Sequence, residues 1–554
     1  MYILGINGGF RPGYQDVSAV LLKDGVVLAA VEEERLSRIK YSPGRLPYLS
    51  IHEVLKTADI TIRDIDLVAF HGSTWGIDIE EKLQAYFSNH FGHCPKIIRY
   101  HHHDCHAMSS YVMSGFETAL SFTMDNSGDG ISLQVSKITP DAIETIYRST
   151  RPHSLGIFYS MITQYAGFTR DGDEYKLMGL SSYGNRHKYD FSFLLNVSEG
   201  QLRINEEYIQ PLLPNQPGSH RDEMLYSRSF TKKMGRDRRV DDSDAATDIY
   251  FKNIAASAQQ HFEHCLMALV EYYVIQTGIR KVCLAGGAAL NCVANQKIMN
   301  LSCVDAIFIQ PASSDAGVSL GAAWLASAEH NIKPVANRNT YLGRAYDNED
   351  IRQMLENCKV SYAFVEHPEI EAAKMIAEGQ VIGWFQGAME FGPRALGNRS
   401  ILANPCNASS KDIVNQKIKF RESFRPFCPS VLEEDVELYF SGKSKQSPYM
   451  TITYDAKDFA LQSIPAVIHV DHTARIQTVS ESDNPLFYSL LRELKRINRH
   501  GVVLNTSFNR SHEPIVCSPR DALATFYSSG LDALFLGNYM ILKKYPAAIG
   551  NIPY

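Results

Sequence analysis

The chain has 554 residues, of which 45% are hydrophobic and 21% are charged, and its formal net charge is -6 at neutral pH. This balance is typical of a globular protein with more than one domain, and it excludes a disordered or fibrous chain. Because the net charge is negative, we expect no nucleic-acid partner, and any anion site must be local.

The spacing of the cysteines and the distribution of apolar residues indicate the cellular compartment of the protein. The ten cysteines are far apart and form no CxxC pair, which indicates free thiols in a reducing compartment and argues against a zinc ribbon. The N-terminus lacks a signal-peptide pattern, and no apolar run approaches the roughly 20 residues that span a bilayer. We therefore expect a cytoplasmic protein without a membrane partner.

The first 150 residues contain two copies of one structural unit, a strand followed by a polar loop and a hairpin. Residues 2–7 are predicted to form a strand that enters a polar loop, and residues 17–32 form a hairpin that turns at Lys23-Asp24-Gly25. About 115 residues later, residues 118–130 repeat the strand and the loop, and residues 131–149 repeat the hairpin. Such a repeat is what a duplicated actin-like nucleotide-binding domain produces.

A helical segment over 245–278 is followed by two strand–turn–helix units, over 280–299 and 304–328. Ligands of open α/β sheets gather at the carboxyl ends of strands, so both turns should face one cleft. The segment that follows is polar and contains Pro and Gly, which is typical of a linker between domains. We predict an α/β protein with an actin-like domain over 1–335, a linker over 336–352 and a second α/β domain over 353–554.

The stretch "YHHHDCHAMSSY" is rich in imidazoles. In a helix, His102 and His106 are four residues apart and share a face, as two ligands of one cation do. This spacing alone is a weak signal that buried structural histidines also produce. Asp125 and Asp315, however, each follow a predicted strand, and two imidazoles with two carboxylates suit Fe(II), Mn(II) or Zn(II).

Anion-binding patterns occur in both halves. Gly286 and Gly287 follow a strand and precede a helix, so their turn either presents amides to an anionic or nucleotide ligand or is simply tight. Lys176 lies beside a Gly-bounded turn, where a lone lysine is usually a surface residue.

The C-terminal half carries a denser basic cluster. Arg394, Arg399, Lys419 and Arg425 alternate with Gly, Pro and aromatic residues instead of forming a polar helical stripe. Because arginine forks bind phosphate bidentately, this pattern favours a polyphosphate pocket over a solvated face. Asn505 and Ser507 follow a predicted strand and suit either a purine, ribose or carboxamide group or a turn cap.

Eight motifs in one order resemble the O-carbamoyltransferases of nodulation and antibiotic biosynthesis. They are "DVSAVLLKDGVVLAAVEEERLSRIK", "HHDCHA", "EYKLMGLSSYG", "LAGGAALN", "SSDAGVSLGAA", "FGPRALGNRSILANP", "FRPFCPSVL" and "NTSFNRSHEPIVCSP". The resemblance implies an actin-like N-terminal domain and a YrdC-like C-terminal domain.

The resemblance also implies the reaction. The YrdC-like half would make carbamoyladenylate from ATP, accompanied by Mg(II), and carbamoyl phosphate, with release of pyrophosphate and phosphate. The N-terminal half would transfer the carbamoyl group to a hydroxyl of a small molecule beside a bound metal, most often Fe(II). The resemblance does not decide the oligomeric state, and a homodimer is one option.

Carried over by motif, the implied site residues fall into three sets. The metal ligands would be His102, His106, Asp125 and Asp315. The adenylate would lie against Gly286, Gly287 and Asn291, near Lys176. Residues for phosphates and nucleotide would be Arg394, Arg399, Lys419, Arg425, Arg475, Asn505 and Ser507, with Lys419 also catalytic.

One departure concerns the base for the acceptor hydroxyl. The family usually has a histidine where this chain has Gln15, and a glutamine cannot accept a proton near neutral pH. Asp16, or His103 as a stand-in, would have to serve. Two alternatives remain: a carbamoyladenylate enzyme that modifies tRNA or a hydrogenase cofactor, and a non-catalytic actin-like nucleotide-binding scaffold.

Overall fold

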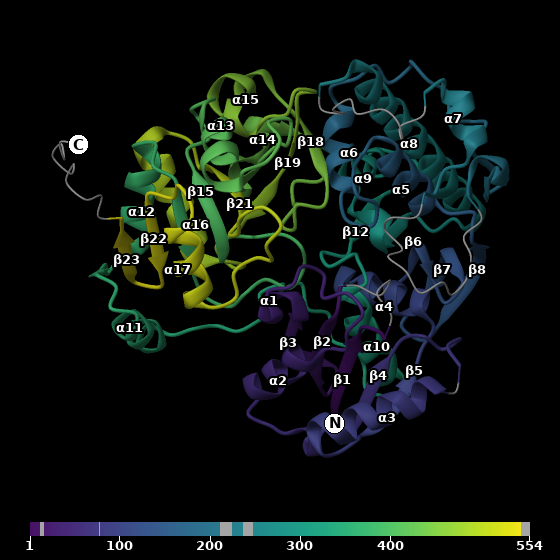
Figure 1. Cartoon of the computed structure of the whole chain (residues 1–554), viewed down its shortest axis with the longest axis horizontal. Coiled ribbons are helices and arrows are strands. Elements are labelled where there is room, and N and C mark those ends of the chain that lie inside the picture. The colour runs from purple at the N-terminus through teal and green to yellow at the C-terminus, as the bar shows by residue number, and fades with distance from the viewer. Residues whose placement is uncertain (11–15, 77, 211–223, 237–246, 544–554) are drawn as a thin grey trace, which may run out of the picture.

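The computed structural model describes residues 1–10, 16–76, 78–210, 224–236 and 247–543, and Gln15 lies outside them. The protein is a mixed α/β molecule (Figure 1). Its helices are α1 (Glu33–Ser37), α2 (Tyr48–Thr57), α3 (Asp78–Phe91), α4 (His102–Ser114), α5 (Leu155–Tyr165), α6 (Glu174–Ser181), α7 (Arg228–Met234), α8 (Ile249–Thr277), α9 (Cys292–Met299), α10 (Ala316–Glu329), α11 (Asn348–Asn357), α12 (Pro368–Ala377), α13 (Ser410–Val414), α14 (Val436–Tyr439), α15 (Asp458–Ser463), α16 (Pro485–Asn498) and α17 (Pro519–Tyr527).

Two five-stranded sheets share one topology. The first has the order β3-β2-β1-β4-β5 and the second the order β8-β7-β6-β11-β12. In each, a hairpin lies antiparallel on the first strand, while the two later strands join it in parallel. The strands are β1 (Tyr2–Asn7), β2 (Ser18–Lys23), β3 (Val26–Glu32), β4 (Leu67–Phe70), β5 (Lys96–Arg99), β6 (Ala119–Gly128), β7 (Ile131–Ile138), β8 (Ile143–Thr150), β11 (Lys281–Ala285) and β12 (Ala306–Ile309), beside a separate hairpin of β9 (Leu195–Ser198) and β10 (Gln201–Ile204). The shared order confirms the predicted duplicated, actin-like arrangement.

Helices α4 and α10 lie between these two sheets. α10 packs on α4, β1 and β2, and α4 packs on β6 and β11. The contact is close because α10 is built largely from small residues: a Cβ on Gly321 would overlap the carbonyl oxygen of Cys105 in α4. This packing brings the N-termini of α4 and α10 to the carboxyl end of β6.

The C-terminal half has an eight-stranded sheet in the order β13-β23-β22-β14-β15-β21-β16-β20. These strands are β13 (Ala363–Phe364), β14 (Ile382–Phe385), β15 (Arg399–Ala403), β16 (Cys428–Leu432), β20 (Gln477–Val479), β21 (Val502–Ser507), β22 (Ala533–Leu536) and β23 (Tyr539–Leu542), and a small sheet holds β17 (Phe440–Ser441), β18 (Thr453–Ala456) and β19 (Thr473–Arg475). Helix α11 begins inside the segment expected to be a linker and packs against α17 and β23. The domain boundaries themselves stay predictions.

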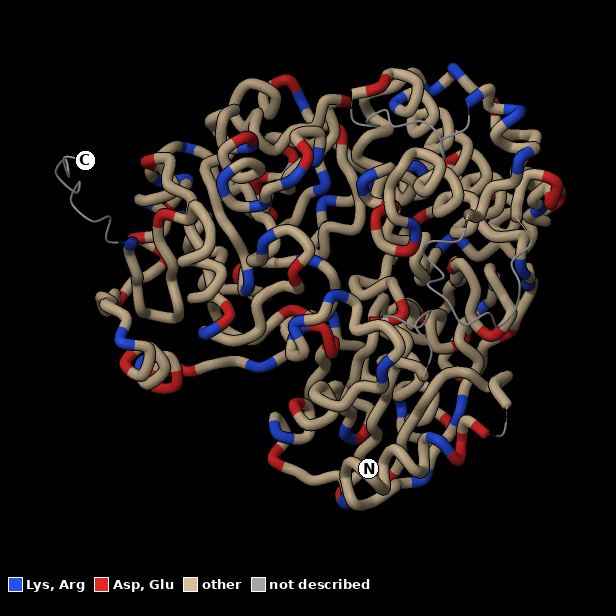
Figure 2. The backbone as a smooth tube through the Cα atoms, in the orientation of Figure 1, with Lys and Arg blue, Asp and Glu red and all other residues tan. Residues whose placement is uncertain are grey.

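The two halves meet along a seam centred on α1. Arg35 donates to the carbonyl of Gly392 (2.8 Å), and Glu32 accepts from the amide of the same glycine (2.8 Å). Arg38 donates to the carbonyl of Pro514 at 2.9 Å. Red and blue segments lie close together here, at the centre of Figure 2.

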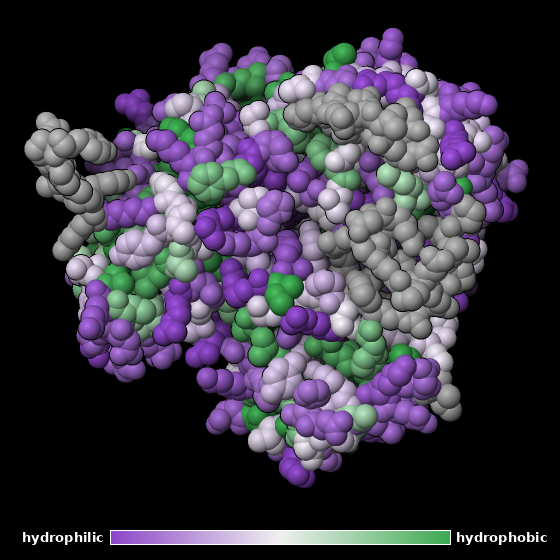
Figure 3. Space-filling model, viewed as in Figure 1, coloured by the Kyte–Doolittle hydropathy of each residue, from purple (hydrophilic) through white to green (hydrophobic). Residues whose placement is uncertain are grey.

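The exterior shown in Figure 3 is mostly hydrophilic with small apolar areas. Within the described ranges, no helix is long and apolar enough to cross a membrane.

Candidate cation and anion sites

Four predicted ligands meet at the carboxyl end of β6. His102 and His106 come from the first turns of α4, and Asp125 comes from β6. Asp315 occupies the N-cap position of α10, and its side chain makes no capping hydrogen bond to that helix. One ligand atom from each of the four lies within 4.8 Å of the others.

The spacing of these atoms fits one metal ion. The His106 Nε2 atom is 3.2 Å from Asp125 Oδ2 and 3.6 Å from Asp315 Oδ1, and His102 Nε2 is 3.4 and 3.6 Å from the same atoms. A tetrahedral ion with bonds of about 2.1 Å separates its ligands by about 3.4 Å. Two imidazoles and two carboxylates therefore form a preassembled N/O set for a divalent cation.

The charges in this set favour a cation as well. Burial alone would lower the pKa of His106, but hydrogen bonds to Asp125 and Asp315 outweigh it and raise that pKa to about 9. Burial would raise the pKa of Asp125, yet its two histidine partners hold it well below its usual value. The Asp125 carboxylate thus stays ionised and attracts positive charge.

The other two histidines of the stretch have structural partners. His101 caps α4 by accepting from the backbone amide of His103. His103 is fully buried, with Nδ1 2.7 Å from Thr123 Oγ1 and Nε2 3.0 Å from the carbonyl oxygen of Ile131. These contacts leave neither nitrogen of His103 for a substrate, so it does not fit the role of stand-in base.

Asp16 fits that role better. Its backbone amide donates to the carbonyl of Tyr41 at 3.0 Å, and its side chain interacts with Ser314 and Asp315. Burial, and then the charge of Asp315, raise its pKa to about 7. A carboxylate with such a pKa can both take up and release a proton near neutrality.

His71 is a residue that the sequence analysis missed. It follows β4, is 3% exposed, and its ring lies 5.3 Å from that of His102. Among the described residues, neither ring nitrogen makes a hydrogen bond of good geometry, and the backbone of Gly8 is the polar group that acts on the ring. Burial, and then His102, hold its pKa well below the usual value, so it is a neutral imidazole beside the cation set. A lone histidine after an apolar run is a faint signal, since core histidines look the same.

The glycine turn borders the cation set. Gly286 has a φ of +89°, and a Cβ on Gly287 would lie 3.3 Å from Asp125 Oδ1. The side chain of Asn291 caps α9 through the amide of Ala294 (3.1 Å) and pairs with Gln259 in both directions at 3.0 Å. The turn after β11 thus lies beside the loop after β6. It also meets the turn after β12, as the sequence predicted, because the Gly286 amide donates to the carbonyl of Ser313 at 2.8 Å.

Lys176 lies at the seam instead of on the surface. It is 8% exposed, and its Nζ is 3.1 Å from Asp173 and 3.4 Å from Glu422 of the other half. Arg425 also pairs with Glu422 at 3.4 Å and stacks 4.7 Å from the ring centre of Tyr175.

Arg394 and Arg475 form a half-buried pair of like charges. Burial, and then Arg475, lower the pKa of Arg394 to about 10. Arg475 donates from Nε and Nη2 to Cys428 Sγ at 3.2 and 3.0 Å. In the described part of the chain, neither guanidinium has a carboxylate within salt-bridge distance, so this pair is suited to an anionic ligand.

Lys419 is enclosed by the loop after β21. Its Nζ donates to the carbonyl and side-chain oxygens of Asn509 at 3.0 and 2.8 Å and to Ser507. Burial, and then the charge of Arg421, hold its pKa well below the ordinary lysine value. The structure therefore brings Lys419 and Ser507 together.

Tyr41 lies between the two centres. Its hydroxyl donates to the carbonyl of Gly172 at 3.3 Å. Burial, and then the charge of Asp16, raise its pKa, and the tyrosine in turn acts on Arg394. The cation set and the anion pair are thus electrostatic neighbours across the seam.

Two predicted residues are engaged by the protein itself. Arg399 is fully buried, and its Nη atoms donate to four backbone carbonyls, at Arg344, Gln386, Gly387 and Asn398. Asn505 donates to Ser430 at 2.9 Å and to the carbonyl of Ala395, which adjoins Arg394, at 3.3 Å. Arg399 does not join the anion cluster, and Asn505 supports the loop that carries Arg394.

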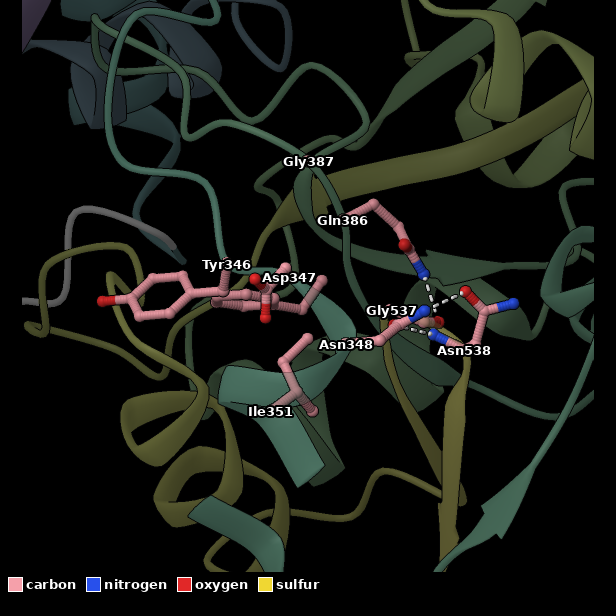
Figure 4. Close-up of a pocket in the computed structure, with 9 residues that line it drawn as sticks. Tyr346, Asp347, Asn348, Ile351, Gln386, Gly387, Gly537 and Asn538 are labelled. Carbon is pink, nitrogen blue, oxygen red and sulfur yellow. Dashed lines mark hydrogen bonds between the residues drawn. The ribbon is translucent and has the colours of Figure 1, made fainter. Parts of the chain in front are cut away.

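A separate cavity of about 290 Å³ lies where β14 and β22 end and α11 begins (Figure 4). Its polar groups bind one another: Gln386 donates to the carbonyl of Gly537 (3.0 Å), and Asn348 donates to Asn538 (2.9 Å). Because these groups are already satisfied, we assign no ligand to this cavity.

Fold and site together define an α/β protein with a cation set and an anion pair at one seam. Two family models match the chain, "Carbamoyltransferase N-terminus" over residues 90–324 and "Carbamoyltransferase C-terminus" over residues 373–543. Nodulation protein NolNO of Sinorhizobium fredii is 35% identical over 98% of this chain and 83% of its own length. An uncharacterized Synechocystis protein, sll1178, is 34% identical over 98% of this chain and 97% of its own.

A 3'-hydroxymethylcephem-O-carbamoyltransferase of Amycolatopsis lactamdurans is 28% identical over 67% of this chain and 65% of its own length. The chain therefore belongs to the carbamoyltransferase family and is a carbamoyltransferase enzyme.

Proposed function

We propose that this enzyme is an ATP-dependent O-carbamoyltransferase with two reaction centres. It joins ATP, accompanied by Mg(II), and carbamoyl phosphate into carbamoyladenylate, and then transfers the carbamoyl group to a hydroxyl of a small-molecule natural product. The observation that carries the proposal is the half-buried Arg394–Arg475 pair, which has no carboxylate within salt-bridge distance among the described residues of a chain of this family.

The first centre uses the C-terminal half. Arg394, Arg425, Arg475 and Lys419 would hold the phosphates of ATP and carbamoyl phosphate, since guanidinium forks and a buried ammonium neutralise phosphate charge. Water would first cleave carbamoyl phosphate into carbamate and phosphate. A carbamate oxygen would then bond to the α-phosphorus of ATP as pyrophosphate leaves. Ser507, which already contacts Lys419, would support that lysine's orientation.

The second centre uses the N-terminal half. The adenylate would lie along Gly286 and Gly287, near Asn291 and Lys176. His102, His106, Asp125 and Asp315 would hold a divalent cation, with Fe(II) as the family suggests, and that cation would supply Lewis-acid polarisation of a carbonyl oxygen. Asp16 would accept the proton of the acceptor hydroxyl. The hydroxyl oxygen would bond to the carbamoyl carbon as AMP leaves.

A small-molecule acceptor is favoured over tRNA. The relative from Amycolatopsis lactamdurans is named for a hydroxymethylcephem. The net charge of -6 gives no general attraction to a polyanion. A non-catalytic scaffold would not need two interacting arginines, Arg394 and Arg475, that have no carboxylate within salt-bridge distance in the part of the chain that the structure describes.

Release of pyrophosphate from ATP, with and without carbamoyl phosphate, tests the proposal. We expect release only when both substrates are present. Lys419→Ala should abolish it, whereas His106→Ala should leave it intact and abolish carbamoyl transfer. If His106→Ala stops pyrophosphate release as fully as Lys419→Ala, the assignment of two centres fails. Wild-type protein that releases none under any condition behaves as a scaffold.

A further inference from the structure

Cys428 holds the guanidinium of Arg475 from one side. It is the first residue of β16, pairs in register with Asn505 of β21, and is 6% exposed. Its sulfur accepts from both Nε and Nη2 of Arg475, at 3.2 and 3.0 Å. These two nitrogens form the edge of the guanidinium that a carboxylate takes in a bidentate pair. Cys428 therefore stands where a carboxylate would usually be.

A second thiol approaches the same guanidinium from the other half of the protein. Cys292, the first residue of α9, is 4% exposed and interacts with Arg475 and Arg394. Its sulfur also lies 3.9 Å from Met178 Sδ. Arg475 is thus flanked by two sulfur atoms, one from each half.

The chemistry of sulfur makes this arrangement useful for an anion site. A cysteine sulfur is a weaker hydrogen-bond acceptor than a carboxylate oxygen, so it can orient a guanidinium while competing less strongly with a bound anion. A carboxylate in the same place would bind Arg475 more strongly, but it would neutralise the charge and compete with an anionic ligand. Two adjacent guanidiniums repel each other, so an unheld Arg475 would turn away from Arg394.

We propose that Cys428 is a positioning residue that orients Arg475 toward Arg394 and leaves both positive charges for a phosphoryl group of the substrate. The inference rests on the proposed function in one respect, namely that the anion is a phosphoryl group. It adds a residue that touches no substrate and acts through Arg475. Cys292 provides the second support from across the seam.

Calorimetric titration of the full-length protein with inorganic phosphate and with carbamoyl phosphate tests this inference. Cys428→Ala should weaken both affinities about tenfold, because a hydrogen bond to a charged group is lost. Cys428→Ser, which keeps a neutral acceptor, should stay within about threefold of wild type. Cys428→Asp should weaken binding more than Cys428→Ala, since it neutralises Arg475.

Cys265→Ala is the matched control, because Cys265 is another buried thiol, 5% exposed, on α8. It should change the melting temperature but neither affinity. If Cys428→Ala melts as a folded protein and binds both anions like wild type, the positioning role is refuted while the proposed function stands. If wild type binds neither anion and releases no pyrophosphate, both fail together.

Discussion

Replacing Gly128 by alanine should disable the cation set without changing any of its ligands. Gly128 is the last residue of β6, and a Cβ there would lie 2.5 Å from His102 Nε2 and closer still to the ring carbons. Non-bonded atoms of this kind settle at about 3.5 Å, so the imidazole must move by roughly 1 Å or more.

That shift is large on the scale of the site. The His102 Nε2 atom lies 3.4 Å from Asp125 and 3.6 Å from Asp315, and a metal tolerates errors of only about 0.2 Å in its bond lengths. We therefore expect Gly128→Ala to lose about 10- to 100-fold in metal affinity, as when the support of a ligand is removed.

The assay is a competition titration of Co(II) or Zn(II) between the full-length protein and a chromophoric chelator. Gly179→Ala serves as the control, since its nearest neighbour would be an ordinary 3.7 Å contact with Phe424. Wild-type metal affinity in Gly128→Ala would show that His102 is not a ligand, or that the site yields more easily than the packing indicates.

Three further substitutions test the surroundings of the site. Since the folded protein raises the pKa of Asp16 to about 7, the stability from its neutral form is complete below about pH 4 and is lost as pH rises through 7. Asp16→Asn should therefore raise the melting temperature of the metal-free protein more at pH 8 than at pH 4, and equal gains would contradict the shift. His71→Phe should leave the melting temperature unchanged or higher, because the imidazole makes no hydrogen bond of good geometry among the described residues; a drop of several degrees would show that its contact with the Gly8 backbone is stabilising. His103→Leu should cost about 1–3 kcal/mol in urea unfolding, because Thr123 and the Ile131 carbonyl lose their partner, and a neutral result would contradict the structural role.

Patterns along the chain predicted much of the cation set. The spacing of His102 and His106 identified one face of α4, and the aspartates at two strand ends identified the place where that face points. The sequence could not separate Arg394 from Arg399, since both are arginines in one Gly-rich frame. What distinguishes them is whether backbone carbonyls lie within reach, and the fold alone decides that.

The fold was predictable to a similar degree. The repeated hairpins indicated the duplication, because their Asp-Gly turns are local signals. Helix α11 was missed in the expected linker, although its buried Ile351 and Leu355 are spaced four apart. Two apolar residues are too few to reveal a helix until the sheet that they cover is known.

The contacts of α1 mean that the two halves cannot be studied as independent parts. Arg35 and Glu32 are 2% and 5% exposed, and each satisfies its charge partly through Gly392. Separating the halves would remove the Gly392 contacts of Arg35 and Glu32, which among the described residues would keep only each other and Glu34 as ionic partners, and would uncover apolar core that continues across the seam. The enzyme should therefore unfold in one cooperative transition, and a destabilising substitution in either half should lower the melting temperature of both halves together.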